Sequence, residues 1–202
     1  MLEWARPAYS RTRVNAAGKA LAHDESSCDA ALNIMRNWRS SHSFPLNALQ
    51  ILTRERALKT DSNAIVAQRL KRQRSIVRKL QEQPKMNLSQ MQDVGGCRAV
   101  VSTVDQVHEL VDRFRTGKSK HELMTDRDYI YQPRASGYRS HHLVFKYYSD
   151  KSLSWNGLRI EVQIRSALQH VWATAVEIVD TFSGGGELKA GKGDERWQRF
   201  SP

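Results

Sequence analysis

The segment Leu158-Arg159-Ile160-Glu161-Val162-Gln163-Ile164-Arg165 alternates strictly between apolar and polar side chains. Successive side chains of a β-strand point to opposite faces of its sheet, so this alternation predicts a strand with one buried and one polar face. Apolar residues at helical spacing predict a long helix directly after it: Leu168, Val171, Trp172, Ala175 and Val179. The strand therefore presents Glu161 on a polar face.

The chain after residue 90 continues to alternate between predicted strands and helices. Cys97–Val101 and Tyr138–Tyr148 are rich in β-branched, aromatic or apolar residues, which is typical of strands. Thr103 and Gln106 resemble a capping box that begins a helix, and Gly117 would end it. This alternation predicts an α/β (α+β) fold in which helices pack on a mixed β-sheet.

The N-terminal part is predicted to be helical. Its apolar residues recur at helical spacing, and Pro45 suits the first turn of a helix. Ser75 is predicted to cap a further short helix. We therefore divide the chain into a helical region at 1–60, a core at 61–182 and a loose, Gly- and Lys-rich tail at 183–202.

The composition of the 202 residues fits a cytosolic protein. The hydrophobic fraction of 40% is enough for a core, and no apolar run approaches the roughly 20 residues that a membrane span needs. The N-terminus has no apolar signal-peptide segment. The two cysteines, Cys28 and Cys97, suit a reducing compartment, and Cys97 is expected to be a buried thiol. We expect a cytoplasmic location and no membrane partner.

The net charge of +11 is unevenly distributed. Residues 1–85 contain 16 Lys/Arg and 7 Asp/Glu, a net charge of +9, whereas the remainder has 16 and 14, a net charge of +2. Residues 69–79 hold six basic side chains and no acid: Arg69, Lys71, Arg72, Arg74, Arg78 and Lys79. Like charges repel unless an anion lies nearby, so this segment predicts a site for phosphates or a polyanion. A solvated basic surface is the alternative interpretation.

A loop rich in aromatic and basic residues runs from Asp126 to His142. Tyr138, Ser140 and His142 are two residues apart, so they would share one face of the strand that follows. An aromatic ring beside polar and basic groups is what a nucleotide needs, since the ring stacks on the base and the cations neutralise phosphates. Taken alone, Tyr138 could be an ordinary surface aromatic and His142 a hydrogen-bonded strand histidine.

Two carboxylates fall on predicted neighbouring strands. Asp93 precedes Gly95 and Gly96, which let the backbone approach another group closely, and Glu161 lies on the polar face of the later strand. Carboxylate and phosphate oxygens are the ligands that Mg²⁺ prefers, so the pair predicts a Mg²⁺ site. Taken alone, Asp93 would also suit a turn, and Glu161 a salt bridge with a neighbouring arginine.

Several other chemistries are excluded. The segment Gly186-Glu-Leu-Lys-Ala-Gly191-Lys192-Gly193 nearly matches a P-loop, but it lacks the final Ser/Thr and follows a predicted helix instead of a strand. The sequence contains no CxxC pair, no HExxH and no GxSxG, so zinc sites and serine hydrolases have no support.

Four blocks in order resemble the synthetase domain of the RelA/SpoT homologues, the alarmone (p)ppGpp synthetases. They are Arg69-Leu-Lys71…Ser75…Lys79 (RxKxxxSxxxK), Asp93-Val-Gly-Gly-Cys-Arg98 (DxxGxR), Tyr129 to His142 (YIxxPKxxGYRSxH), and Glu161-Val-Gln163-Ile-Arg165 with Gln169-His170-Val-Trp172-Ala173 (ExQxRT…W). Together they span roughly residues 65–180. The resemblance implies a nucleotidyltransferase-like mixed sheet and transfer of the β,γ-pyrophosphate of ATP to a ribose hydroxyl.

The resemblance implies a role for each matched residue on the donor side. Arg69 and Arg98 would sandwich the adenine of ATP, and the donor phosphates would be held by Lys71, Ser75 and Lys79. The chemical work would be mostly alignment and charge neutralisation.

The matched positions also imply the metal ligands and the acceptor site. Asp93 and Glu161 would bind Mg²⁺, and Glu161 would help to deprotonate the attacking 3′-hydroxyl. Tyr138 would stack on the acceptor base. The residues implied on the acceptor side are Arg134, Tyr138, Ser140, His142 and Gln163.

The chain departs from the family pattern in a few places. Arg134 stands where the family usually has Lys, which keeps the charge but changes the donor geometry, and Ser166 stands where Thr is common. We find no N-terminal phosphohydrolase domain with its His-Asp pair. We therefore expect a synthetase-only member, with a tail that ends before the C-terminal helices or regulatory domains of relatives.

Three functions remain open from the sequence. The first is pyrophosphorylation of GDP or GTP to (p)ppGpp with release of AMP. The second is the same chemistry on the 3′-CCA end of tRNA, as in toxic relatives, which would suit the basic N-terminal half and an antitoxin partner. The third is an inactive nucleotide- or RNA-binding module, which the retained Asp93 and Glu161 argue against. The sequence leaves open a regulatory domain or a homo-oligomer as partner.

Overall fold

The structure is a computed structural model that describes residues 3–23, 29–133 and 136–182. The N-terminal part is helical, as predicted, with α1 (Arg11–His23), α2 (Asp29–Ser41) and α3 (Ser43–Thr60). Pro45 lies in the first turn of α3, where its missing N–H costs no helical hydrogen bond. The segment at 183–202, with its P-loop-like stretch, lies outside the described residues.

The rest of the described chain builds a mixed sheet with short and long helices between its strands. In chain order these elements are β1 (Ile65–Leu70), α4 (Gln73–Glu82), η1 (Leu88–Gln90), β2 (Gly95–Val101), α5 (Val104–Thr116), β3 (Glu122–Asp128), β4 (His141–Lys146), η2 (Leu153–Trp155), β5 (Arg159–Ser166) and α6 (Ala167–Phe182). The strand order is β1-β2-β5-β4-β3; β2 and β5 are parallel, and the other neighbours are antiparallel. The predicted fold class is confirmed.

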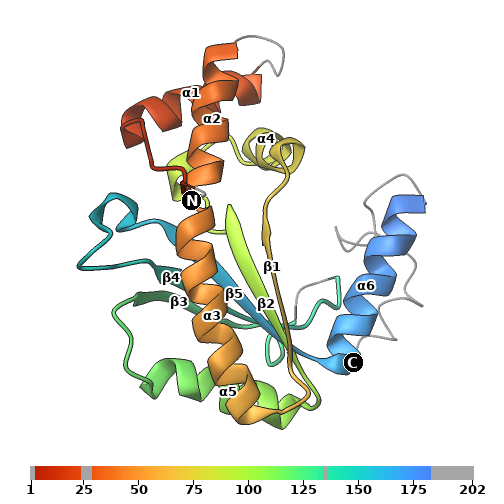
Figure 1. The fold of residues 1–202 in the computed structure, drawn as a ribbon. Helices are drawn as coiled ribbons and strands as arrows, with labels where there is room; N and C mark the ends of the chain where they lie inside the picture. Colours follow the sequence, from red (N-terminus) through yellow and green to blue (C-terminus); the bar gives the residue numbers. More distant parts are fainter. Residues whose placement is uncertain (1–2, 24–28, 134–135, 183–202) are drawn as a thin grey trace.

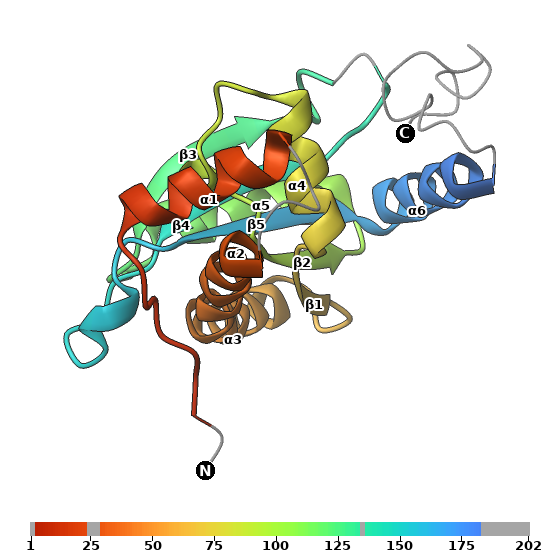
Figure 2. The ribbon, with the colours of Figure 1, turned by 90° about the horizontal axis from the view of Figure 1, so that it is seen from above.

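One face of this sheet is covered and the other carries polar side chains. Helices α3 and α5 pack on the covered face (Figure 1). The alternation predicted for β5 is confirmed, because Ile160, Val162 and Ile164 are completely buried on that side. Burial of each such side chain contributes about 1.5–3 kcal/mol, which anchors the strand and turns its polar positions outward. Seen from above, α6 extends away from the end of β5 (Figure 2).

Gly95 and Gly96, the first two residues of β2, face opposite sides of the sheet. A Cβ on Gly95 would lie 2.9 Å from Cδ1 of Ile160 and 3.4 Å from Cβ of His42, the N-cap of α3, so a larger residue would require the Ile160 side chain to shift. Gly96 faces the other way, and a Cβ there would meet only ordinary contacts with Glu161. The close approach predicted for this pair is therefore chiefly a helix–strand contact at Gly95.

Several boundaries differ from the predictions. Ser75 is not the cap of α4, because Lys71 still pairs with the backbone of Val94 and the extended Arg72 is the N-cap. The strand predicted at Tyr138–Tyr148 is shorter, since β4 spans His141–Lys146. The edge strands β1 and β3 were not predicted. The capping box of α5 is confirmed, with Gln106 N donating to the hydroxyl of Thr103 at 3.2 Å.

Two expectations about the environment can be compared with the structure. Cys97 is a buried free thiol, as predicted, and burial raises its pKa to about 12. The other cysteine, Cys28, lies outside the described residues. Among the helices of the described ranges, none has the length and apolar character needed to cross a membrane.

Candidate active site

The open face of the sheet lines up polar side chains across its strands. Pairing of β2, β5, β4 and β3 produces one row: Arg98, Gln163, His142 and Arg127. The adjacent row contains Arg69, Gly96 and Glu161. Because the strands are hydrogen-bonded neighbours, residues far apart in the sequence meet on one surface.

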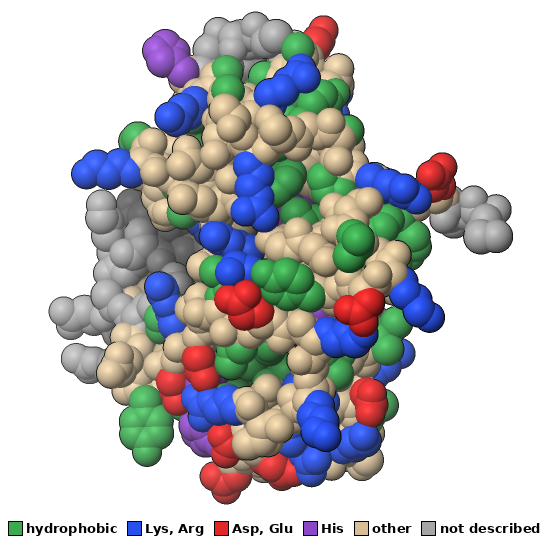
Figure 3. All heavy atoms as spheres, turned by 90° about the vertical axis from the view of Figure 1, so that its left-hand side faces the viewer, with side chains coloured by type: hydrophobic (Ala, Val, Ile, Leu, Met, Phe, Trp, Pro, Cys, Tyr) green, Lys and Arg blue, Asp and Glu red, His purple; other side chains and the backbone are tan. Residues whose placement is uncertain are grey.

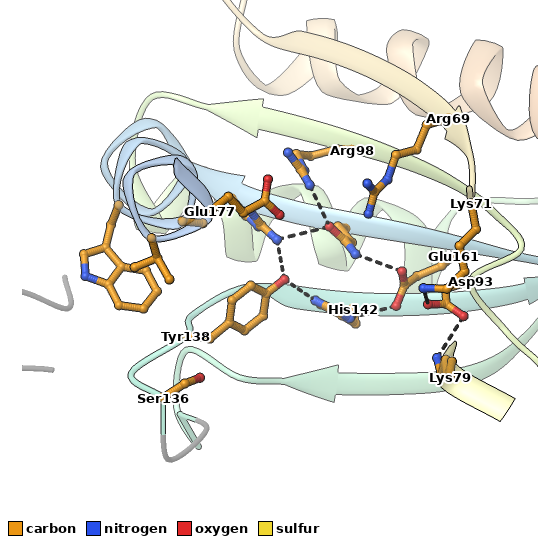
Figure 4. A pocket seen from close by; sticks show the side chains of 15 residues that line it. Arg69, Lys71, Lys79, Asp93, Arg98, Ser136, Tyr138, His142, Glu161 and Glu177 are labelled. Atoms are coloured by element: carbon orange, nitrogen blue, oxygen red, sulfur yellow. Dashed lines mark hydrogen bonds and ion pairs between the residues drawn. The ribbon is translucent and has the colours of Figure 1, made fainter. Parts of the chain in front are cut away.

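A cavity of about 370 Å³ opens above these rows, between the sheet, α4 and α6. Figure 4 shows the side chains that line it. Four of the five residues predicted to bind ATP are among them: Arg69, Lys71, Lys79 and Arg98. The fifth, Ser75, lies half-buried on α4 and outside the described lining of this cavity.

Asp93 lies between two lysines at the end of this cavity. Its Oδ2 lies 2.9 Å from Nζ of Lys71, and its Oδ1 lies 2.9 Å from Nζ of Lys79. Burial raises the pKa of the Asp93 carboxyl, but the two ammonium groups outweigh burial and hold that pKa below its usual value. The acid is therefore ionised at neutral pH, with cations on both oxygens.

A second cavity, of about 440 Å³, lies on the other side of Asp93 and Glu161. The two cavities share a wall made of Lys79, Asp93, His142 and Glu161. The second cavity is lined further by Thr125, Arg127, Tyr129, Gln83, Gln90 and Gln92, together with Met86 and Val144. Sequence reasoning missed Arg127 as a site residue because it lies on β3, the edge strand that was not predicted.

Glu161 lies in the shared wall and is held by two donors. His142 Nδ1 lies 2.9 Å from Oε1, and Gln163 Nε2 lies 2.8 Å from Oε2. Burial raises the pKa of Glu161, whereas the contacts with His142 and Gln163 lower it, and the net effect is a pKa below the usual value. The structure thus brings the two predicted carboxylates, Asp93 and Glu161, to one wall.

The predicted acceptor residues are placed differently from one another. Gly137 has a φ of 75°, a conformation that favours glycine, and it turns the chain so that Tyr138 faces the first cavity. Ser140 is completely buried; its hydroxyl donates to the carbonyl of Ile164 at 3.1 Å, and it lines neither of these two cavities. Arg134 lies outside the described residues.

A polar cluster behind the site anchors the loop that carries Tyr138. Oδ1 of Asp128 accepts from the backbone N–H groups of Ile130 and Tyr131, at 2.8 and 3.0 Å, which fixes the turn after β3. On the same strand, Asp126 meets Nε2 of the buried His141 at 2.6 Å. These contacts fasten the end of β3 to the beginning of β4, where His142 enters the site.

Helix α6 closes the first cavity at the end opposite the lysines. Trp172, Ala173 and Val176 form a small apolar cluster against Tyr138, and Glu177 completes this side. His170, on the same helix, has a lowered pKa because of burial and the nearby charges of Arg98 and Arg165. Trp172 belongs to a block singled out in the sequence, but its place in the cavity wall was not predicted.

Comparison with family models identifies residues 68–179 as a region found in RelA/SpoT proteins. This match covers more than half of the chain. The chain belongs to the RelA/SpoT family. The resemblance seen in the four sequence blocks is therefore confirmed.

Two curated proteins from Bacillus subtilis (strain 168) are similar to this chain. GTP pyrophosphokinase YjbM is 32% identical over 91 residues, which is 45% of this chain and 43% of YjbM. GTP pyrophosphokinase YwaC is 26% identical over 163 residues, which is 72% of this chain and 76% of YwaC. The alignment thus spans less than half the length of YjbM.

Two solved structures are similar to this chain in fold. A GTP pyrophosphokinase family protein from Streptococcus pneumoniae is 27% identical with a TM-score of 0.63, over 77% of this chain and 78% of that chain. The small alarmone synthetase 1 from Bacillus subtilis, bound to its product pppGpp, is 24% identical with a TM-score of 0.67, over 79% and 85%. These likenesses agree with the mixed sheet described above.

Proposed function

We propose that this chain transfers the β,γ-pyrophosphate of ATP to the 3′-hydroxyl of GDP or GTP. The observation that carries the proposal is the wall of Lys79, Asp93, His142 and Glu161 between two cavities. Two nucleotides seated on either side would meet at these groups. The similarity to proteins named GTP pyrophosphokinase supports the same activity.

The first cavity suits ATP. Arg69 and Arg98 lie on adjacent strands, and guanidinium planes can stack on the two faces of a base. Lys71 and Lys79 stand at the other end, where ammonium groups would neutralise the phosphates. The separation of arginines from lysines gives ATP one orientation, with its phosphates toward the shared wall.

We assign the acceptor nucleotide to the second cavity, which differs from the predicted stacking of the acceptor base on Tyr138, because Tyr138 and Gln163 line the first of these two cavities and not the second. Arg127 and Tyr129 supply a cation for phosphate and an aromatic ring, and the neighbouring glutamine amides can hydrogen-bond to polar groups of a nucleoside. His142 and Glu161 close this cavity on the side of the first one. An acceptor held here would present its ribose to the shared wall.

In the proposed reaction the 3′-oxygen of the acceptor attacks the β-phosphorus of ATP. A bond forms between these atoms, and the bond from the β-phosphorus to the oxygen that bridges to the α-phosphorus breaks, so AMP leaves. Glu161 accepts the hydroxyl proton, since it is ionised and borders both cavities. Lys71 and Lys79 stabilise the charge on the pyrophosphate.

The residues of the shared wall fit Mg²⁺. Asp93 and Glu161 are close enough for their charges to interact, and carboxylate oxygens are suitable ligands. Within residues 3–23, 29–133 and 136–182, no group of three or more His, Cys, Asp or Glu side chains forms a site by itself. Phosphate oxygens and water would therefore complete the shell. When bound, Mg²⁺ would neutralise part of the phosphate charge.

A second candidate acceptor is the 3′ end of tRNA, and the exposed basic residues of α4 favour it. Arg72, Arg74 and Arg78 are exposed and lie outside the described lining of both cavities, so ATP does not account for them. Figure 3 shows basic side chains over the upper part of one face, which the N-terminal helices form, and mixed charges lower down. Phosphate contacts of this kind dominate binding to RNA.

One labelling experiment separates the two acceptors. The protein is incubated with γ-³²P-labelled ATP and Mg²⁺ together with GDP, GTP or tRNA, and the products are resolved. We expect label on the guanosine nucleotides and release of AMP, with no label in a matched Glu161→Gln variant. Label on tRNA alone would replace the first candidate by the second. Absence of label from all three acceptors would reject pyrophosphate transfer to either class.

A further inference from the structure

A closed circuit of hydrogen bonds joins five side chains on the floor of the site (Figure 4). Oε1 of Glu161 lies 2.9 Å from Nδ1 of His142, whose Nε2 lies 2.8 Å from the hydroxyl of Tyr138. Nη2 of Arg165 donates to that hydroxyl and, at 3.1 Å, to Oε1 of Gln163. Gln163 closes the circuit, because its Nε2 lies 2.8 Å from Oε2 of Glu161.

With His142 as a neutral imidazole, the chemistry of the members sets the direction of every bond. A carboxylate only accepts, so Glu161 requires the proton on Nδ1 of His142 and the amide nitrogen of Gln163 beside it. A neutral imidazole protonated at Nδ1 accepts at Nε2, so the hydroxyl of Tyr138 donates to His142. A guanidinium only donates, so Arg165 faces the oxygens of Tyr138 and Gln163. All five hydrogen bonds of the circuit have compatible donors and acceptors.

The ring of Tyr138 is fixed separately from its hydroxyl. The guanidinium of Arg165 lies over one face of this ring, 4.8 Å from the centroid, and Arg165 is only 4% exposed. A base could stack only on the opposite face, and a phenylalanine would offer that face equally well. The hydroxyl is therefore not needed for stacking. Its hydrogen bonds to His142 and Arg165 indicate its role.

We infer that the hydroxyl of Tyr138 and the guanidinium of Arg165 are positioning groups that fix the tautomer of His142 and, through it, the carboxylate of Glu161. With one donor on each oxygen, the remaining lone pairs of Glu161 point toward the cavities. The effect on turnover rests on the proposed function, whereas the circuit belongs to the free protein and is measurable without substrates.

Long-range ¹H–¹⁵N spectra of the histidines test the circuit, with a His142→Gln variant to assign the signals. In the wild-type protein we expect His142 to be protonated at Nδ1 and unprotonated at Nε2. Tyr138→Phe removes the donor to Nε2, so both nitrogen shifts should move toward the average of two exchanging tautomers. Tyr129→Phe is the matched control, because its ring meets His142 edge-on at 5.1 Å but its hydroxyl is outside the circuit, and the shifts should stay unchanged.

The kinetic consequence is measured on the same variants, after thermal melts show that they are folded. Tyr138→Phe should lower kcat about tenfold, the effect of losing one oriented hydrogen bond, and leave KM for ATP unchanged. A wild-type His142 protonated at Nε2, or Tyr138→Phe with unchanged shifts or unchanged kcat, would overturn the inference. If the wild-type protein labels no acceptor, the proposed function fails, and the spectra alone decide the circuit.

Discussion

Nζ of Lys79 lies 2.9 Å from Oδ1 of Asp93, which joins α4 to the loop before β2 in the wall that both cavities share. Lys71, just beyond the end of β1, holds the other oxygen at the same distance. Each charge compensates the burial of its partner, so this ion-pair group is stable without phosphates. An incoming pyrophosphate would engage the two lysines and release the carboxylate for a cation.

The charge of Asp93 is expected to be essential. Asp93→Asn keeps the shape of the side chain but removes the anion, so the rate of pyrophosphate transfer should fall at least about a hundredfold, as for other charged groups placed at a reacting phosphate. Product formation at saturating substrates and Mg²⁺ is the measurement. Glu82→Gln is the matched control, because Glu82 lies on the exposed surface of α4 and should retain the wild-type rate. Full activity of Asp93→Asn would contradict the proposed role of Asp93 as a metal ligand.

Arg69 and Arg127 are expected to affect opposite substrates. Arg69 lines only the first of the two cavities and Arg127 only the second. Arg69→Ala should therefore raise KM for ATP, and Arg127→Ala should raise KM for GDP, each about tenfold, as expected for loss of one charge-assisted contact. Initial rates with one substrate varied at a time measure both constants. An equal rise of both constants in either variant would contradict the assignment of the cavities. Arg113→Ala should change neither constant, because the half-buried Arg113 is outside the described lining of both cavities.

The sequence predicted the strands and helices that have one fully buried apolar face. Ile160, Val162 and Ile164 of β5 are completely buried, so alternation was visible in the sequence. Strands β1 and β3 form the two edges of the sheet, and none of their side chains is fully buried; Ile65, at the beginning of β1, is 66% exposed. An edge strand pairs on one side only, and little apolar alternation is needed to hold it. The sequences of β1 and β3 therefore lack the apolar alternation from which a strand is predicted.

The sequence singled out candidate site residues that lie in ordered motifs and missed those that only strand pairing brings to the cavities. Asp93 and Glu161 meet because β2 and β5 are neighbours, as predicted, and their pairing is parallel. The place of Arg127 depends on the pairing of β3 with His142 on β4, which no local pattern encodes. Ser140 shows that a motif match does not by itself place a side chain in a cavity. It matches the motif, but its hydroxyl donates to the backbone of β5.

The N-cap of α5 is expected to contribute stability without affecting activity. The hydroxyl of Thr103 accepts from Gln106 N, and Gln106 Oε1 accepts from Thr103 N at 3.0 Å. Thr103→Ala should lower the free energy of unfolding by about 1 kcal/mol. Urea denaturation measures this loss, and the transfer rate of the folded variant should equal that of the wild type. A stability unchanged within error would show that solvent replaces the cap.

His42 is expected to make the protein less stable in acid. Its side chain is 1% exposed, and Nδ1 lies 2.7 Å from the carbonyl oxygen of Trp38, to which a neutral ring donates. Burial lowers the pKa of His42 from 6.5 to about 4, and the hydrogen bond to Trp38 offsets this only in part. The unfolded chain therefore takes up the proton at higher pH than the folded protein. Stability is unaffected above pH 6.5 and falls as the pH drops toward 4, by about 3 kcal/mol in total.

Urea denaturation at several pH values between about 8 and 4 measures this loss through the free energy of unfolding. His42→Gln retains an N–H for the carbonyl of Trp38 but does not titrate, so its stability should fall less steeply below pH 6.5 than that of the wild type. The difference between the two curves isolates His42 from the other groups whose pKa is lowered, such as His121. The exposed His23→Gln variant should follow the wild-type curve. Parallel curves for wild type and His42→Gln would show that the buried imidazole does not cause the acid sensitivity.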